Sequence, residues 1–106
     1  MLDLSKIYKD NYYEVRLIDG TELKLKRPTQ AMVEVAMEMM NDDTNDKEAV
    51  KRISQLFARI LNRNTDDKVF TREDLIEEYD INIIVYVIKD YFEYWNKEVA
   101  DKVDFQ

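Results

Sequence analysis

The sequence predicts a mainly α-helical domain of the α+β class, with an N-terminal β-hairpin followed by a bundle of three to four helices that ends in a long C-terminal helix. Residues 81–99 place their bulky apolar side chains on one side at helical spacing. Residues 12–26 alternate apolar and polar side chains around an Asp-Gly pair, which is typical of a hairpin. With one glycine and one proline, the chain has few helix breakers, and we expect residues 1–106 to form a single domain.

The composition excludes several classes of function. The chain has no cysteine and no histidine, which removes disulfides, thiolate zinc sites, thiol nucleophiles and the commonest general base. A net charge of −7 repels phosphate backbones and anionic lipid, so we expect neither nucleic acid nor a membrane as a partner. The N-terminus lacks a basic region followed by an apolar run, and no stretch approaches the roughly 20 apolar residues of a membrane span. We therefore expect a cytoplasmic location.

The register of the hairpin over residues 12–26 follows from its charges. A two-residue Asp19-Gly20 loop would place apolar residues opposite charged ones on the same face. A three-residue loop over 18–20, with Gly20 as a left-handed bulge residue, instead pairs apolar residues with one another. The predicted partners are Val15 with Leu23 and Tyr13 with Leu25, and the other face carries Glu14, Arg16, Glu22, Lys24 and Lys26. We expect the apolar face to lie on helices.

Helices are predicted over residues 30–41, 45–62, 72–79 and 81–99. The expected N-caps are Thr29, Asn45, Thr71 and Asp80. Side chains of these types accept hydrogen bonds from the first helical turn. Residues 83–88 are rich in β-favouring isoleucine and valine, but the helical period continues far beyond the length of a strand and favours a helix. Residues 100–106 are expected to fray.

The loop that begins at Asn62 partly matches a calcium-binding loop. It offers oxygen ligands at Asn64 and Asp66 and a glutamate, Glu73, at the twelfth position. However, its first residue is not aspartate, and Asp67 stands where the turn needs glycine. We expect a solvated connection between two helices and no bound metal.

The paired carboxylates Glu73/Asp74 and Glu77/Glu78 fit helix N-termini and exposed faces, where the helix dipole stabilises acids. The only glycine, Gly20, lies in the hairpin, so no glycine-rich phosphate loop is possible. We expect no enzymatic activity, no catalytic residues and no cofactor.

The helix predicted over residues 30–41 has an apolar arc of about 240°, which is wider than a surface helix needs. Methionine adapts to irregular partners, and tyrosine is favoured at interfaces. We therefore expect a partner-binding surface made by this arc and by residues that flank the main apolar stripe of the last helix. Its members are Met32, Met37, Met39, Met40, Ile83, Val87 and Tyr94. The alternative is that these residues form the core, and the same surface would serve either self-association or an apolar client helix.

Two stretches resemble a known family: YYEVRLIDGTELKLKRPT at residues 12–29 and FTREDLIEEYD at residues 70–80, each running into a helix. Their layout resembles the small, acidic tail assembly chaperones of long-tailed bacteriophages and prophages. The resemblance implies a hairpin before a helical bundle, no catalysis and a tendency to self-associate. It also implies that the chain binds the apolar, helical tape measure protein, keeps it soluble and recruits tail tube protein in the host bacterial cytoplasm, without entering the mature virion.

Two other classes of function stay open at this point. A structural phage component, such as a head-tail connector or a tail completion protein, would enter the mature particle. A small acidic regulator that acts by protein-protein contact would co-purify with a host enzyme.

Overall fold

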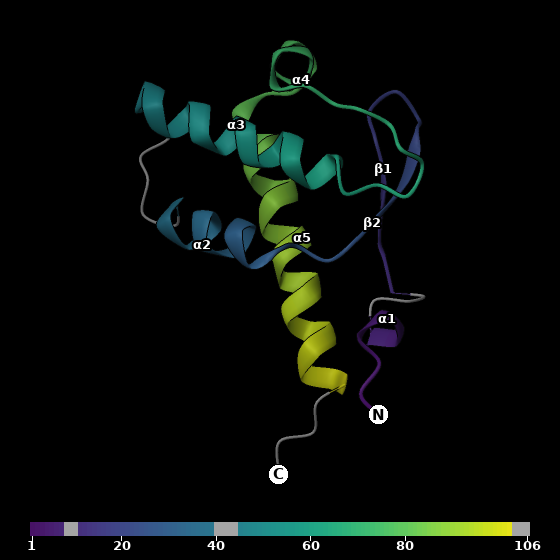
Figure 1. Ribbon diagram of the computed structural model, residues 1–106. Coiled ribbons are helices and arrows are strands. Elements are labelled where there is room, and N and C mark those ends of the chain that lie inside the picture. The colour runs from purple at the N-terminus through teal and green to yellow at the C-terminus, as the bar shows by residue number, and fades with distance from the viewer. Residues whose placement is uncertain (8–10, 40–44, 103–106) are drawn as a thin grey trace.

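A computed structural model describes residues 1–7, 11–39 and 45–102, and it confirms the predicted fold class (Figure 1). In this part of the chain, a two-stranded antiparallel hairpin is followed by four helices. The elements are α1 (Leu4–Ile7), β1 (Tyr13–Arg16), β2 (Glu22–Leu25), α2 (Gln30–Met39), α3 (Lys47–Leu61), α4 (Arg72–Glu78) and α5 (Ile81–Lys102).

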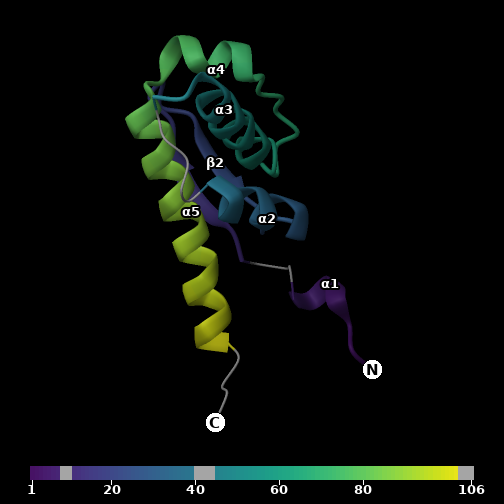
Figure 2. The ribbon, with the colours of Figure 1, turned by 90° about the vertical axis from the view of Figure 1, so that its left-hand side faces the viewer.

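The long helix α5 is the element on which the rest of the fold is arranged. α3 lies across α5, α2 packs on α3, and β1 runs beside α5 (Figures 1 and 2). Side chains from the hairpin and from α2 to α5 form one hydrophobic core. Its most completely buried large members are Tyr91, Phe57, Leu23, Leu25, Met32, Leu56, Ile60, Leu61 and Ile84. Each such side chain contributes roughly 1.5–3 kcal/mol when it leaves water, which holds the elements together.

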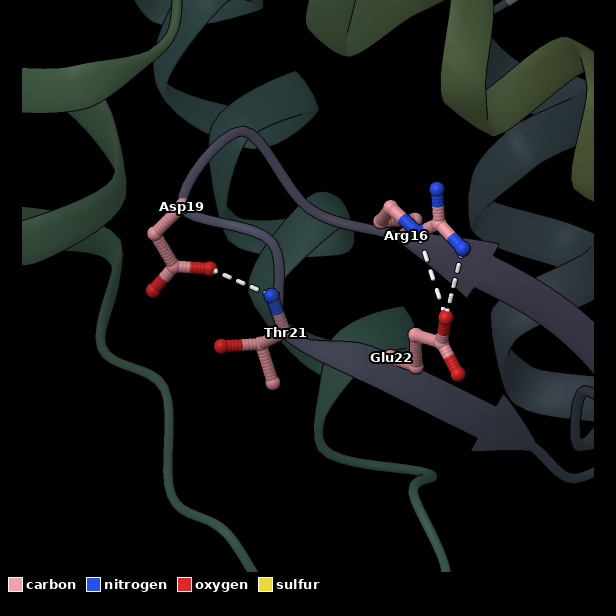
Figure 3. Close-up of polar contacts among 4 residues, drawn as sticks. All are labelled: Arg16, Asp19, Thr21 and Glu22. Carbon is pink, nitrogen blue, oxygen red and sulfur yellow. Dashed lines mark hydrogen bonds and ion pairs between the residues drawn. The ribbon is translucent and has the colours of Figure 1, made fainter.

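The hairpin has the register that its charges predict. β1 and β2 pair Tyr13 with Leu25 and Val15 with Leu23. Leu17 N–H donates to the Thr21 carbonyl at 2.8 Å, and Gly20 adopts a φ of +90°, which closes a three-residue loop with a bulge. The Asp19 carboxylate accepts a hydrogen bond from Thr21 N–H at 2.9 Å and stabilises this turn (Figure 3).

The loop between α3 and α4 covers the outer edge of β2. Thr65 N–H donates to the Lys24 carbonyl at 3.1 Å, and Lys26 N–H donates to the Arg63 carbonyl at 2.9 Å. The loop is held in shape by the buried side chain of Asn64, whose amide group donates to two backbone carbonyls and accepts from two backbone N–H groups. β2 is therefore paired on both sides.

Three of the four predicted helix caps are confirmed. The hydroxyls of Thr29 and Thr71 each accept a hydrogen bond, at 3.2 Å, from the N–H group three residues later. The Asp80 carboxylate accepts one from Ile83 N–H at 2.9 Å, between the end of α4 and the start of α5. The fourth prediction, Asn45, is wrong: Asp46 is the cap, and its carboxylate accepts from Glu48 N–H at 2.9 Å, so α3 begins at Lys47.

The helix ends also differ from prediction in places. α5 continues to Lys102, so residues 100–102 are helical rather than a frayed end; neither glycine nor proline is present there to stop the helix. α2 is described as far as Met39, and the predicted continuation to residue 41 lies outside the described residues. The short helix α1 was not predicted, and the Asp3 carboxylate accepts hydrogen bonds from Ser5 at its start.

Candidate functional site

An apolar cleft lies between α2 and α5. Both helices pack on α3, and the space left between them is about 90 Å³. Its lining residues are Ala36, Met39, Ile53, Val85, Ile88 and Lys89. Pockets for small organic ligands are larger, typically above about 300 Å³. A space of about 90 Å³ is comparable in size to one aliphatic side chain.

The cleft owes its chemistry to where its residues lie on their helices. Among the lining residues, Ile53 and Ile88 are buried, whereas Met39 and Val85 are half-buried. Among the lining residues that the structure describes, Lys89 is the only charged one. It is exposed, so its ammonium group lies next to water while its stem extends the apolar surface.

A second apolar surface lies on the opposite flank of α5, beside β1. Here Ile83 is 42% exposed and Tyr86 is 70% exposed, while Val87 and Tyr94 are half-buried. The Tyr94 hydroxyl donates to the Tyr12 carbonyl at 3.0 Å, which ties this flank to the hairpin. Successive helical residues are rotated by about 100°, so Val85 and Val87 fall on different sides of α5.

The residues predicted for partner binding therefore do not form one surface. Met39 lines the cleft, whereas Ile83, Val87 and Tyr94 share the flank beside β1. Met32 is only 2% exposed and lies in the core. Met37 is 63% exposed and does not line the cleft, and Met40 lies outside the described residues.

Sequence reasoning missed most of the cleft. Ala36, Val85 and Ile88 belong to the apolar faces of the helices predicted over residues 30–41 and 81–99, and periodicity alone does not distinguish a core position from a cleft position. The available signal was the excess width of the apolar arc on α2, which indicated that some of it would lack a partner within the fold.

Buried tyrosines join the hairpin to α5. The Tyr13 hydroxyl donates to the Asp90 carboxylate at 2.6 Å, and the Tyr91 hydroxyl donates to the Lys26 carbonyl at 2.5 Å. Burial raises the pKa of Tyr13 well above its usual value, and the bond to Asp90 and the charge of that carboxylate raise it further. Burial likewise raises the pKa of Tyr91. Both hydroxyls stay protonated and act as donors.

The loop that partly matches a calcium site uses its amides for backbone hydrogen bonds. Asn62 accepts from Phe70 N–H at 2.7 Å and donates to the Phe70 carbonyl at 2.9 Å, and Asn64 binds backbone groups in the same way. Within the described residues, no three acidic side chains lie together in a group that could hold a metal ion. The paired carboxylates Glu73/Asp74 and Glu77/Glu78 lie exposed on α4.

In comparisons with known proteins, no protein-family model, curated protein or solved structure matches the chain. None of the helices in the described part of the chain combines the length and the apolar content needed to cross a membrane.

Proposed function

We propose that this chain is a non-enzymatic tail assembly chaperone of a phage or prophage, which binds the apolar, helical tape measure protein and keeps it soluble until tail tube protein surrounds it. The observation that carries this proposal is the apolar cleft between α2 and α5. Its size, and the fact that Lys89 is the single charged residue in the described part of its lining, fit an anchoring side chain from a client helix better than a small ligand or a substrate.

The cleft suits a client that must later be released. One anchor side chain in a small cleft gives limited affinity, because most of the gain from apolar burial is offset by the cost of ordering both partners. The methionine at its edge, Met39, adapts to different client side chains as the chaperone binds along a long helix. The net charge of −7 keeps the resulting complex soluble.

The proposal is tested by co-expressing the chain with the long, helix-rich, apolar protein encoded nearby. We expect that protein to become soluble only in the presence of this chain, and the two to co-elute. Met39→Glu places a charge in the cleft and should abolish co-elution, whereas Met37→Glu, two residues away on the exposed side of α2, should preserve it. Circular dichroism checks that both variants keep their helices.

If Met39→Glu and Met37→Glu retained the client equally well, the cleft would not be the binding site. The proposal also places the chain in the host bacterial cytoplasm and outside the mature virion. Mass spectrometry of purified particles decides this point, because finding the chain there in stoichiometric amounts would favour a connector or tail completion protein instead.

A further inference from the structure

The outer edge of β1 is open in its middle. Leu17 N–H bonds to the Thr21 carbonyl across the hairpin, and hydrogen-bonded pairs alternate along an antiparallel ribbon. Val15 and Tyr13 therefore direct their N–H and C=O groups toward β2, while Glu14 and Arg16 direct theirs away from it. The same alternation is seen on β2, where the Lys24 carbonyl points outward and accepts from Thr65.

Tyrosine hydroxyls close both ends of this edge. Tyr94 donates to the Tyr12 carbonyl at 3.0 Å, and Ile18 N–H donates to the Tyr79 hydroxyl at 3.3 Å. Within the residues that the structure describes, no protein group bonds to the outward N–H and C=O groups of Glu14 and Arg16. An edge of this kind is a template for another strand.

The charges on β1 are complementary to those of a second, antiparallel copy of the same strand. If two β1 strands pair antiparallel about a two-fold axis at Val15, each Glu14 lies opposite the second copy's Arg16. A shift of two residues would place Glu14 opposite Glu14 or Arg16 opposite Arg16, which repel. A shift of one residue would place outward backbone groups opposite inward ones. One register therefore satisfies both the charges and the hydrogen bonds.

This register extends charge pairs that already exist within each hairpin. Arg16 forms an ion pair with Glu22 at 2.6 Å on the exposed face (Figure 3), and Glu14 lies opposite Lys24 in the strand register. Across the proposed axis, the order of charges becomes Lys24, Glu14, the second copy's Arg16 and the second copy's Glu22. Signs alternate along the whole row, so every charge has opposite neighbours.

The flank of α5 beside β1 would be covered by the same contact. Tyr79 lies at the Ile18 end of β1 and Tyr94 at the Tyr12 end, so α5 runs antiparallel to β1 with Tyr86 near its middle. The two-fold axis would bring the two α5 flanks together beneath the joined sheet. This buries Tyr86, which is 70% exposed in the single chain, and supplies the apolar contact that a short strand pairing needs.

We propose that the chain forms a two-fold dimer in which β1 pairs with β1 of a second copy and the α5 flanks pack against each other. This interface uses the surface on the other side of α5 from the client cleft, so it stands or falls independently of the proposed chaperone function.

The test is sedimentation velocity on the full chain and on two charge-reversal variants. Glu14→Arg places arginine opposite arginine across the axis, and Arg16→Glu places glutamate opposite glutamate. Each variant alone should dimerise at least about tenfold more weakly than the unaltered chain. An equimolar mixture should recover the dimer, because one chain then carries arginine at both positions and the other carries glutamate at both. A folding defect would not be repaired by mixing.

Two further variants separate the interface from the hairpin. Arg16→Pro removes an outward N–H without breaking a bond to β2, and should also weaken the dimer. Lys24→Glu disturbs the charge pair inside the hairpin but leaves the β1 edge intact, and should change the dissociation constant by less than about threefold. A chain that stays monomeric up to its solubility limit overturns the proposal, and so does a dimer that Arg16→Pro and the two reversals leave unchanged.

Discussion

The two flanks of α5 make different kinds of surface from one helix. The flank facing α2 is a small cleft lined almost entirely by aliphatic side chains and methionine, whereas the flank facing β1 combines tyrosines with an open strand edge. An aliphatic cleft imposes few directional demands and suits varied client side chains. Backbone hydrogen bonds and alternating charges fix a register and suit one defined partner. The difference favours a variable client on one flank and a second copy on the other.

The largest expected effect comes from removing the core that both flanks share. Tyr91 of α5 is fully buried, and Tyr91→Ala should lower the free energy of unfolding by about 3–5 kcal/mol. Tyr91→Phe keeps the ring and loses only the hydrogen bond to the Lys26 carbonyl, so it should cost about 1–3 kcal/mol. Urea unfolding measures both. Equal losses in the two variants would mean that the ring contributes little.

High pH should weaken the flank beside β1, where the buried hydroxyls lie. Burial raises the pKa of Tyr13, Tyr79 and Tyr91 in the folded chain above the unfolded value of about 10. Their contribution is therefore complete below about pH 10 and is lost as pH rises above it, at up to about 1.4 kcal/mol per pH unit for each tyrosine. The free energy of unfolding, measured with urea across this pH range, should fall less steeply for Tyr13→Phe than for the unaltered chain. If the unfolding free energy of Tyr13→Phe fell with pH as steeply as that of the unaltered chain, the Tyr13 hydroxyl would not be one of the groups responsible.

A carboxylate introduced on one flank of α5 should affect a different function from a carboxylate introduced on the other flank. Tyr86→Glu should weaken dimerisation by at least about tenfold, because two carboxylates would meet near the two-fold axis. Val85→Asp, one residue earlier, faces the cleft and should leave the dimer intact while reducing client binding. Sedimentation velocity measures dimerisation, and co-elution measures client binding. Loss of the dimer in both variants would show that the flanks are not separate.

A smaller effect is expected from the turn that aligns β1. Gly20 has a φ of +90° and open space around it, so Gly20→Ala meets no atom but adopts an unfavourable backbone conformation. We expect a loss of about 1–2 kcal/mol in unfolding free energy and no change in client binding. Urea unfolding provides the measurement, and a stabilised variant would contradict the bulged turn.

The smallest effect is expected at Met37, which belongs to neither flank. Met37→Glu should change the free energy of unfolding by less than about 0.5 kcal/mol, because the side chain is already exposed. It should also leave the dimer unchanged in sedimentation velocity. A marked change in either measurement would mean that the outer side of α2 has a partner.

The elements and the hairpin register were predictable because local chemistry decides them. Val15 and Leu23 had only one pairing that kept charges off the apolar face, and Thr71 and Asp80 are strong caps wherever they precede a helix. Asp46 and Asn45 are both good caps, so the sequence alone did not choose between them. Side chains of both types accept the same hydrogen bond.

The surfaces were harder to predict, because they depend on how helices pack. α2 is apolar around most of its circumference, so its sequence does not say that Met32 faces the core while Met39 faces the cleft. The role of Asn64 depends on carbonyls at both ends of a loop whose path is set by β2. The open edge of β1 follows from the register, but its closure at both ends by Tyr79 and Tyr94 needs the tertiary structure.

The most direct test of the two-flank account is the soluble fraction of the co-expressed tape measure protein with three chains: the unaltered one, Met39→Glu and Glu14→Arg. We expect the unaltered chain and Glu14→Arg to keep the client in the supernatant, because the cleft is intact in both, and we expect Met39→Glu to leave it in the pellet. A client that stays soluble with Met39→Glu, or that is lost with Glu14→Arg, would contradict the assignment of separate flanks.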